Sequence, residues 1–87
     1  MGSVPAPDDY TTIQLDLVGL KCPLPVLRTR KALASMAAGA LLEVCASDPL
    51  AAIDIPHLLH QLGDTLVAQQ RKGSTLLFTI RKGSVSG

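Results

Sequence analysis

Residues 13–26, which read IQLDLVGLKCPLPV, determine how the chain begins to fold. The first five of them alternate apolar and polar side chains, which is the pattern of a half-buried strand. Gly19 and the prolines that follow it end this strand. From Pro25 to about Ala38 the chain is rich in helix-forming residues, with apolar side chains on one face and charged side chains on another. A strand followed by an amphipathic helix is therefore predicted, with Gly39 as the helix stop.

The rest of the chain continues this alternation of strands and helices. Residues 41–46 are predicted to form a second strand, and Asp48-Pro49 is typical of a helix start. Apolar residues at i, i+3, i+4 and i+7 then predict a second helix that ends at Gly63. Because Pro56 disfavours helical geometry at the preceding residue, we expect this helix to begin near Asp54, with Asp54-Ile55-Pro56 as its starting motif.

Two further strands complete the predicted order, at residues 65–70 and 75–81, with a tight turn at residues 72–74. The order β-α-β-α-β-β predicts an α/β fold, a two-layer α/β sandwich in which two helices cover one face of a four-stranded mixed sheet. The other face is expected to stay largely open for a partner and to carry residues such as Gln14, Glu43 and Thr79.

The size and composition of the chain predict one small globular domain. The 87 residues have a mass of 9.1 kDa, with 47% hydrophobic and 17% charged residues. We expect residues 13–83 to form the domain, between a disordered lead-in at residues 1–12 and a C-terminal tail at residues 84–87. No apolar run approaches the ~20 residues that span a bilayer, so no membrane partner is expected.

The charge, the aromatic content and the cysteine count narrow the classes of partner. The net charge is +1 and the chain has one Tyr, one Phe and no Trp, which argues against DNA binding and against base-stacking modules. Contact with tRNA is therefore not expected. Two cysteines cannot build a disulfide framework, which favours a reduced, cytoplasmic location.

Cys22 is the residue whose surroundings indicate chemistry. Pro23 and Pro25 stiffen the segment and should place Cys22 just ahead of a helix N-terminus, with Leu24 also outside the helix. The positive end of the helix and the neighbouring Lys21 are expected to lower the pKa of the thiol. The same field would stabilise the anionic terminal sulfur of a persulfide, which favours acceptance and release of sulfur over hydrolysis. The alternative is a small apolar residue without reactivity.

Several short motifs resemble those of the TusA/SirA-like sulfur-carrier family, and the resemblance runs from about Ile13 to Gly83. The matching pieces are Leu15-Asp16 with Gly19-Leu20, Cys22-Pro23-Leu24-Pro25, Arg30-Lys31, Asp48-Pro49, Asp54-Ile55-Pro56, Leu66-Val67 and Arg81-Lys82-Gly83. The resemblance implies the same β-α-β-α-β-β order, a catalytic persulfide on Cys22, and a sulfurtransferase-type carrier rather than a stand-alone catalyst.

The same resemblance implies the partners. They are a sulfur donor protein, such as a cysteine desulfurase or a rhodanese, and an acceptor protein. The sulfur would enter tRNA thiolation, sulfur oxidation or molybdenum-cofactor synthesis. No metal or organic cofactor is implied, and we expect a monomer.

Leu24 and a set of basic residues are the candidate docking positions. Leu24 is apolar where tRNA-thiolation members of the family carry an acidic residue, so it suits a different partner surface. A basic patch around Cys22 would suit an acidic partner protein or a tRNA backbone, although such residues can simply form a solvated face. Its members would be Lys21, Arg28, Lys31, Arg81 and Lys82.

Arg30 and two histidines have less specific interpretations. Arg30 interrupts the apolar stripe of the first helix, either as a side chain that reaches past apolar neighbours to solvent or as an ion-pair partner of Asp16 or Asp48 that shapes the thiol site. His57 and His60 could share a helix face, but zinc would need a further ligand, so we interpret them as surface or partner-facing residues.

Two other classes of function remain open. In the first, the chain is a redox or regulatory thiol module in which Cys22 forms a disulfide with Cys45 or with a partner; otherwise Cys45 is a small hydrophobic residue of the second strand. In the second, the chain is a small RNA-binding regulatory domain that uses its open sheet face, which the scarcity of aromatic residues argues against.

Overall fold

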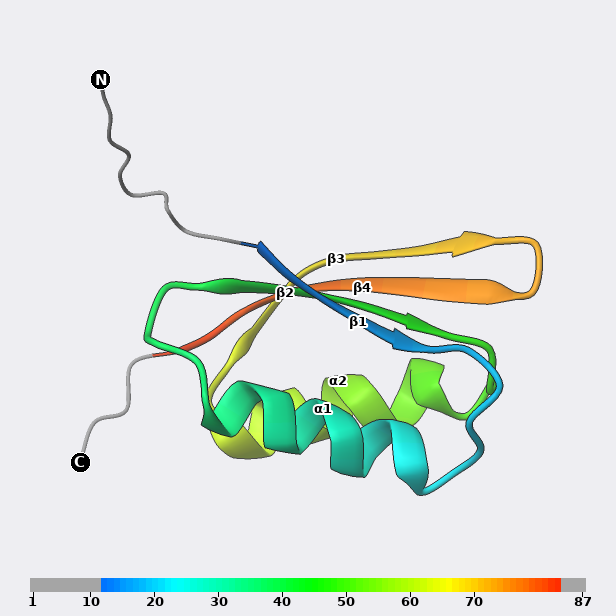
Figure 1. Cartoon of the computed structure of the whole chain (residues 1–87), viewed down its shortest axis with the longest axis horizontal. Coiled ribbons are helices and arrows are strands. Elements are labelled where there is room, and N and C mark those ends of the chain that lie inside the picture. Colours follow the sequence, from blue (N-terminus) through cyan, green and yellow to red (C-terminus); the bar gives the residue numbers. More distant parts are fainter. Residues whose placement is uncertain (1–11, 84–87) are drawn as a thin grey trace.

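The computed structural model describes residues 12–83, along which strands and helices alternate (Figure 1). The predicted lead-in and tail fall on residues 1–11 and 84–87, which lie outside the described residues, whereas Thr12 is the first residue of a strand. The elements are β1 (Thr12–Leu17), α1 (Leu24–Ala34), β2 (Leu41–Ala46), α2 (Ala51–Leu62), β3 (Thr65–Lys72) and β4 (Thr75–Arg81).

The strands form one mixed sheet in the order β1-β2-β4-β3. Strand β1 is parallel to β2, and β4 is antiparallel to both β2 and β3. Both helices lie on the same side of the sheet (Figure 1). The predicted α/β sandwich, with its order of elements and its four-stranded mixed sheet, is therefore confirmed. Because β1 and β2 are parallel, the loops that leave their C-terminal ends emerge at the same edge of the fold.

The core lies between the sheet and the two helices. Alternate residues of β2 and β4 point toward the helices, since side chains on a strand alternate between its faces. Those on the helix side are buried, namely Leu42, Val44, Ala46, Leu76, Phe78 and Ile80. Leu33 of α1 and Ile55 and Leu59 of α2 complete the same cluster. Burying each large apolar side chain contributes about 1.5–3 kcal/mol to folding, so this layer determines which face the helices cover.

The opposite face of the sheet is open, as the sequence predicts. Glu43 is exposed and Thr79 is half-buried, and the Gln14 side chain of β1 donates a 2.7 Å hydrogen bond to the Glu43 carboxylate of β2. The hairpin of β3 and β4 turns at Gly73, which has a positive φ of 61°. Glycine adopts this conformation with little strain, which accounts for the predicted tight turn.

The helices differ from the prediction at their ends. Helix α1 includes Leu24 and stops at Ala34, four residues before the predicted end, whereas α2 begins at Ala51 rather than near Asp54. The early start of α2 follows from the Ala51 amide, which donates to the Asp48 carbonyl and closes a turn. Pro56 lies inside α2, where it removes one backbone hydrogen bond while the buried neighbour Ile55 holds the helix against the core. Within residues 12–83, neither helix is long and apolar enough to span a membrane.

Candidate functional site

The site is built where the C-terminal ends of β1 and β2 meet the beginnings of the two helices. Asp48 follows β2 and is only 9% exposed. Its Oδ2 accepts the Cys22 amide at 2.6 Å, and its Oδ1 accepts the Leu50 amide at 3.0 Å. The Gly19 amide also donates to the Ser47 hydroxyl at 2.8 Å. These bonds join the loop that carries Cys22 to the loop that begins α2, so they hold the backbone of Cys22 in place.

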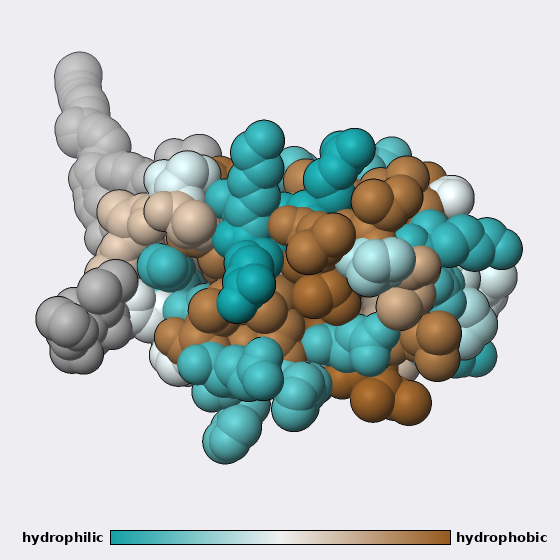
Figure 2. Space-filling view, turned by 90° about the horizontal axis from the view of Figure 1, so that it is seen from below, coloured by the Kyte–Doolittle hydropathy of each residue, from teal (hydrophilic) through white to brown (hydrophobic). Residues whose placement is uncertain are grey.

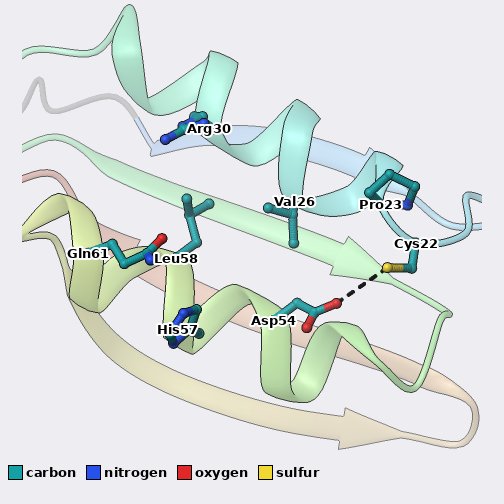
Figure 3. A pocket seen from close by; sticks show the side chains of 8 residues that line it. All are labelled: Cys22, Pro23, Val26, Arg30, Asp54, His57, Leu58 and Gln61. Carbon is teal, nitrogen blue, oxygen red and sulfur yellow. Dashed lines mark hydrogen bonds between the residues drawn. The ribbon is translucent and has the colours of Figure 1, made fainter.

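The Cys22 thiol is exposed and points toward the first turn of α2 (Figure 3). Its Sγ donates to Asp54 Oδ2 across 3.6 Å. The sequence predicts both Asp48 and Asp54 as helix-start residues, with Asp48 also as an alternative ion-pair partner of Arg30. Asp48 does accept the Leu50 amide at the beginning of the helix, as predicted, but Asp54 lies within α2 and contacts the thiol instead. The two Asp-containing motifs therefore contribute two carboxylates to the surroundings of Cys22.

A groove of about 230 Å³ runs between α1 and α2, starting from the thiol. Cys22 and Pro23 lie at one end, and Arg30 and Gln61 lie at the other (Figure 3). The groove is completed by Val26, Asp54, His57 and Leu58. The Cys22 thiol at its end is exposed, as a group that exchanges atoms with another molecule must be.

The electrostatics of Cys22 differ from the prediction, since its pKa is raised rather than lowered. Partial desolvation by the groove raises the pKa of Cys22, the hydrogen bond to Asp54 raises it further, and the negative charges of Asp54 and Asp48 act in the same direction. The predicted effect of the helix end was wrong because few amides are free there: the Leu24 amide donates to the Lys21 carbonyl, and Pro25 has no N–H.

Lys21 acts on a neighbouring carboxylate. The hydrogen bonds from the Leu50 and Cys22 amides lower the pKa of Asp48 and outweigh the opposing effect of desolvation, and the positive charge of Lys21 makes a smaller contribution in the lowering direction. Asp48 is therefore held as an anion that anchors the loop. The sequence predicts that Lys21 acts on the thiol, but it does not predict that its charge acts on the carboxylate of Asp48.

The predicted basic patch does not form around Cys22. Arg28 and Lys31 lie on α1 beside a separate groove that includes Leu15 of β1. Arg81 pairs with Leu41 and Thr65 at the opposite end of the sheet, and the amide of Lys82 donates there to the Ala40 carbonyl. Since β4 runs antiparallel to β2, its last residues lie at the end of the sheet away from the thiol. Of the five predicted members, only Lys21 adjoins Cys22.

The other predicted residues lie in several places. Leu24 is 42% exposed in the first turn of α1, and Arg30 is exposed within the groove. No ion pair joins Arg30 to Asp16 or Asp48 within residues 12–83, and both carboxylates accept backbone amides instead. His57 lines the groove, and His60 is exposed on α2. Within the described residues, no three His, Cys, Asp or Glu side chains form a metal site.

Cys45 lies on the other side of the sheet from the groove. It alternates with the buried residues Val44 and Ala46, and it borders a small hollow with Glu43 and Thr79 on the open face. Both cysteines are free. A disulfide between Cys22 and Cys45 has no support from this arrangement.

The fold and the site together define a small α/β domain that presents a single exposed thiol at the beginning of a helix. The family model described as Sulfurtransferase TusA matches residues 13–82. The chain belongs to the TusA family.

Individual relatives agree with this assignment. The chain is 44% identical over 68 residues to the sulfur carrier protein TusA of Pseudomonas putida strain F1, covering 78% of this chain and 85% of that protein. It is 39% identical over 69 residues to the sulfur carrier protein TusA of Allochromatium vinosum, covering 79% and 91%. The crystal structure of a SirA-like protein from Desulfitobacterium hafniense superposes with a TM-score of 0.74 at 25% identity, covering 84% of this chain and all of that chain.

Proposed function

We propose that this protein is a sulfur carrier that holds sulfane sulfur as a persulfide on Cys22 and passes it to an acceptor protein. The observation that carries the proposal is the exposed thiol at the open end of the groove between α1 and α2. Membership of the TusA family supports the same function, because the relatives are sulfur carrier proteins.

The chemistry needs no cofactor and no net oxidation. The Cys22 sulfur attacks the terminal sulfur of a donor persulfide, a new S–S bond forms, and the S–S bond of the donor breaks. The bonding pair leaves with the donor sulfur, which takes up the proton lost by Cys22. The net exchange is Cys22–SH + R–S–SH → Cys22–S–SH + R–SH. Discharge to an acceptor thiol repeats the exchange with Cys22 as the donor.

Apolar side chains around the thiol support docking against another protein. Leu24, Leu50 and Ile53 are 42%, 50% and 67% exposed, and they lie at the beginnings of the two helices, on the end of the molecule where the loop of Cys22 meets the loop before α2. Figure 2 shows apolar and polar side chains alternating over the helix side of the molecule. We infer that a cysteine desulfurase or rhodanese donor, and the acceptor in turn, covers this end of a monomeric carrier.

The remaining predicted site residues have proposed roles in the same contact. Pro23 and Pro25 hold the loop, and Arg30 supplies a cation at the far end of the groove. Arg28 and Lys31 lie on the adjoining side of α1, so they could contact only a partner that extends around that helix. Arg81 and Lys82 are too far from the thiol end to belong to this docking surface. A cytoplasmic location stays a prediction from the cysteine content.

Sulfur loading can be tested by intact mass spectrometry after incubation with polysulfide, or with a cysteine desulfurase and cysteine. We expect one added sulfur on the wild type and on Cys45→Ser, and none on Cys22→Ser. Cys45→Ser is the matched control, because it removes the other thiol and leaves the groove intact. Equal loading of Cys22→Ser and the wild type would contradict the proposal.

A further inference from the structure

Asp54 is the one carboxylate that contacts the sulfur atom of Cys22 within residues 12–83. Resting on the proposed function, we propose that Asp54 sets how readily Cys22 releases its sulfur, because its negative charge stabilises the empty thiol and destabilises the loaded persulfide anion. Asp54 would thus be a residue that tunes the sulfur-transfer equilibrium, and the carrier would favour delivery over storage.

The position of Asp54 is fixed by the fold. It is half-buried in the first turn of α2, and a carboxylate is favoured there by the positive end of the helix dipole. Cys22 is held from the other side by its backbone bond to Asp48 at 2.6 Å. The 3.6 Å contact between the thiol and Asp54 Oδ2 therefore joins two anchored groups (Figure 3).

The empty and loaded forms of Cys22 respond differently to this carboxylate. The empty thiol is neutral and donates its proton to Asp54 as a hydrogen bond. A persulfide is a stronger acid than the thiol from which it forms, so at neutral pH its terminal sulfur is an anion with no proton to donate. That anion faces the charges of Asp54 and Asp48, and like charges at short range repel. Loading thus replaces a favourable contact with an unfavourable one.

The other charged groups near Cys22 offset this repulsion only in part. Lys21 precedes Cys22 in the chain, and its charge acts on the carboxylate of Asp48. Arg30 lies at the far end of the groove, and His57 lies along it on α2. The raised pKa of the Cys22 thiol agrees with a net negative influence at the sulfur, with desolvation as its largest cause.

The atoms balance without a further reactant. In discharge, the terminal sulfur of Cys22–S–S⁻ first takes up a proton from solvent, and an acceptor thiolate then attacks this sulfur and forms a new S–S bond. The S–S bond to Cys22 breaks and its electron pair stays on Cys22 Sγ. The acceptor persulfide ionises, and a proton returns to Cys22, which regains its hydrogen bond to Asp54. Removing the negative charge of Asp54 should shift this equilibrium toward the loaded form by about threefold to tenfold, the effect of one unit charge across several ångströms in a largely hydrated site.

The experiment measures the ratio of loaded to empty protein at equilibrium. Wild type and Asp54→Asn are incubated at neutral pH with a fixed mixture of glutathione persulfide and glutathione, and the two forms are quantified by intact mass. The matched control is Glu43→Gln, which also removes one carboxylate charge but on the open face of the sheet. We expect a several-fold higher ratio for Asp54→Asn and an unchanged ratio for Glu43→Gln.

The outcomes separate the two proposals. If the wild type does not load at all, the proposed carrier function fails. If the wild type loads and Asp54→Asn reaches the same or a lower ratio, only the role of Asp54 is overturned. Asp54→Ser is measured in parallel, and circular dichroism shows whether each variant is folded, so a folding defect in one variant does not decide the result. The excess loading of the variants should also shrink at acidic pH, where the persulfide is protonated.

Discussion

One cysteine lies on each side of the sheet, Cys22 in a loop and Cys45 in a strand, and the two differ in exposure and in their contacts with charged side chains. Cys22 lies on the helix side at the end of a groove, exposed and in contact with Asp54. Cys45 lies on the open side within β2, half-buried and paired in register with Asp16 of β1 and Leu77 of β4. The difference shows that the loops and helix ends around Cys22 create the candidate site, because a thiol without them, as at Cys45, has no comparable surroundings.

The largest expected effect is a difference in unfolding free energy between substitutions on the two faces of the sheet. Phe78 is 1% exposed on the helix side of β4, and its neighbour Thr79 points to the open side. Phe78→Ala should cost about 3–5 kcal/mol of unfolding free energy because it leaves a cavity in the core. Thr79→Ala should cost less than about 1 kcal/mol. Urea denaturation of both variants checks this, and equal losses would contradict the assignment of the covered face.

The next effect concerns Asp48, whose carboxylate joins the loop of Cys22 to the loop before α2. The pKa of Asp48 is lowered in the folded protein, so the unfolded chain binds more protons at acidic pH. The stabilisation is present above the ordinary pKa of 3.8 and is lost as the pH falls through the lower folded value. Asp48→Asn should be less stable at neutral pH and should lose less stability on acidification. Urea denaturation midpoints of the wild type and of Asp48→Asn, measured from neutral to acidic pH, test both expectations. The same loss of stability on acidification in the two proteins would contradict this role of Asp48.

A smaller effect concerns the ionisation of the Cys22 thiol. Because the pKa of Cys22 is raised, its alkylation by iodoacetamide should reach half-maximal rate at a higher pH in the folded protein than in urea. Asp54→Asn should move this midpoint down, since it removes a negative charge and replaces a charged hydrogen-bond acceptor with a neutral one. The Cys45→Ser background isolates the signal of Cys22. A half-maximal pH that is lower in the folded protein than in urea would contradict the raised pKa and support the lowered pKa of Cys22 that the sequence predicts.

The smallest effect on stability concerns docking at the thiol end. Leu24 is exposed, so Leu24→Glu should change the unfolding free energy by less than about 0.5 kcal/mol. It should slow sulfur transfer from a donor protein, because a charge replaces an apolar contact, and leave loading from polysulfide unchanged. Loading rates from the two sources, measured side by side, test this. Equal slowing with both sources would place the effect on the thiol itself.

The sequence predicts the fold far better than the electrostatics of the site. Period-two alternation in β4 and the apolar stripe of α2 depend on local burial, so they reveal both layers and the open face. The start of α2 is missed because tertiary packing of Ile55 overrides the preference imposed by Pro56. The hydrogen bonds of Cys22 to Asp48 and Asp54 are missed because these carboxylates lie 26 and 32 residues away along the chain.

One signal in the sequence could have located Asp48 near the thiol. Asp48 closely follows β2, and a strand-helix-strand unit predicts that β1 and β2 are parallel with their C-terminal ends together. That placement brings Asp48 to the loop of Cys22. It also separates Arg81 and Lys82 from the thiol, since β4 runs in the opposite direction.

The most direct measurement compares the two thiols within one wild-type molecule. After loading with polysulfide, blocking of the sulfur atoms and digestion, mass spectrometry of the peptides shows where the added sulfur resides. The sulfur should be found on the peptide that contains Cys22, and the peptide that contains Cys45 should carry none. Sulfur on Cys45 alone, or equally on both peptides, would contradict the assignment of Cys22 as the carrier residue.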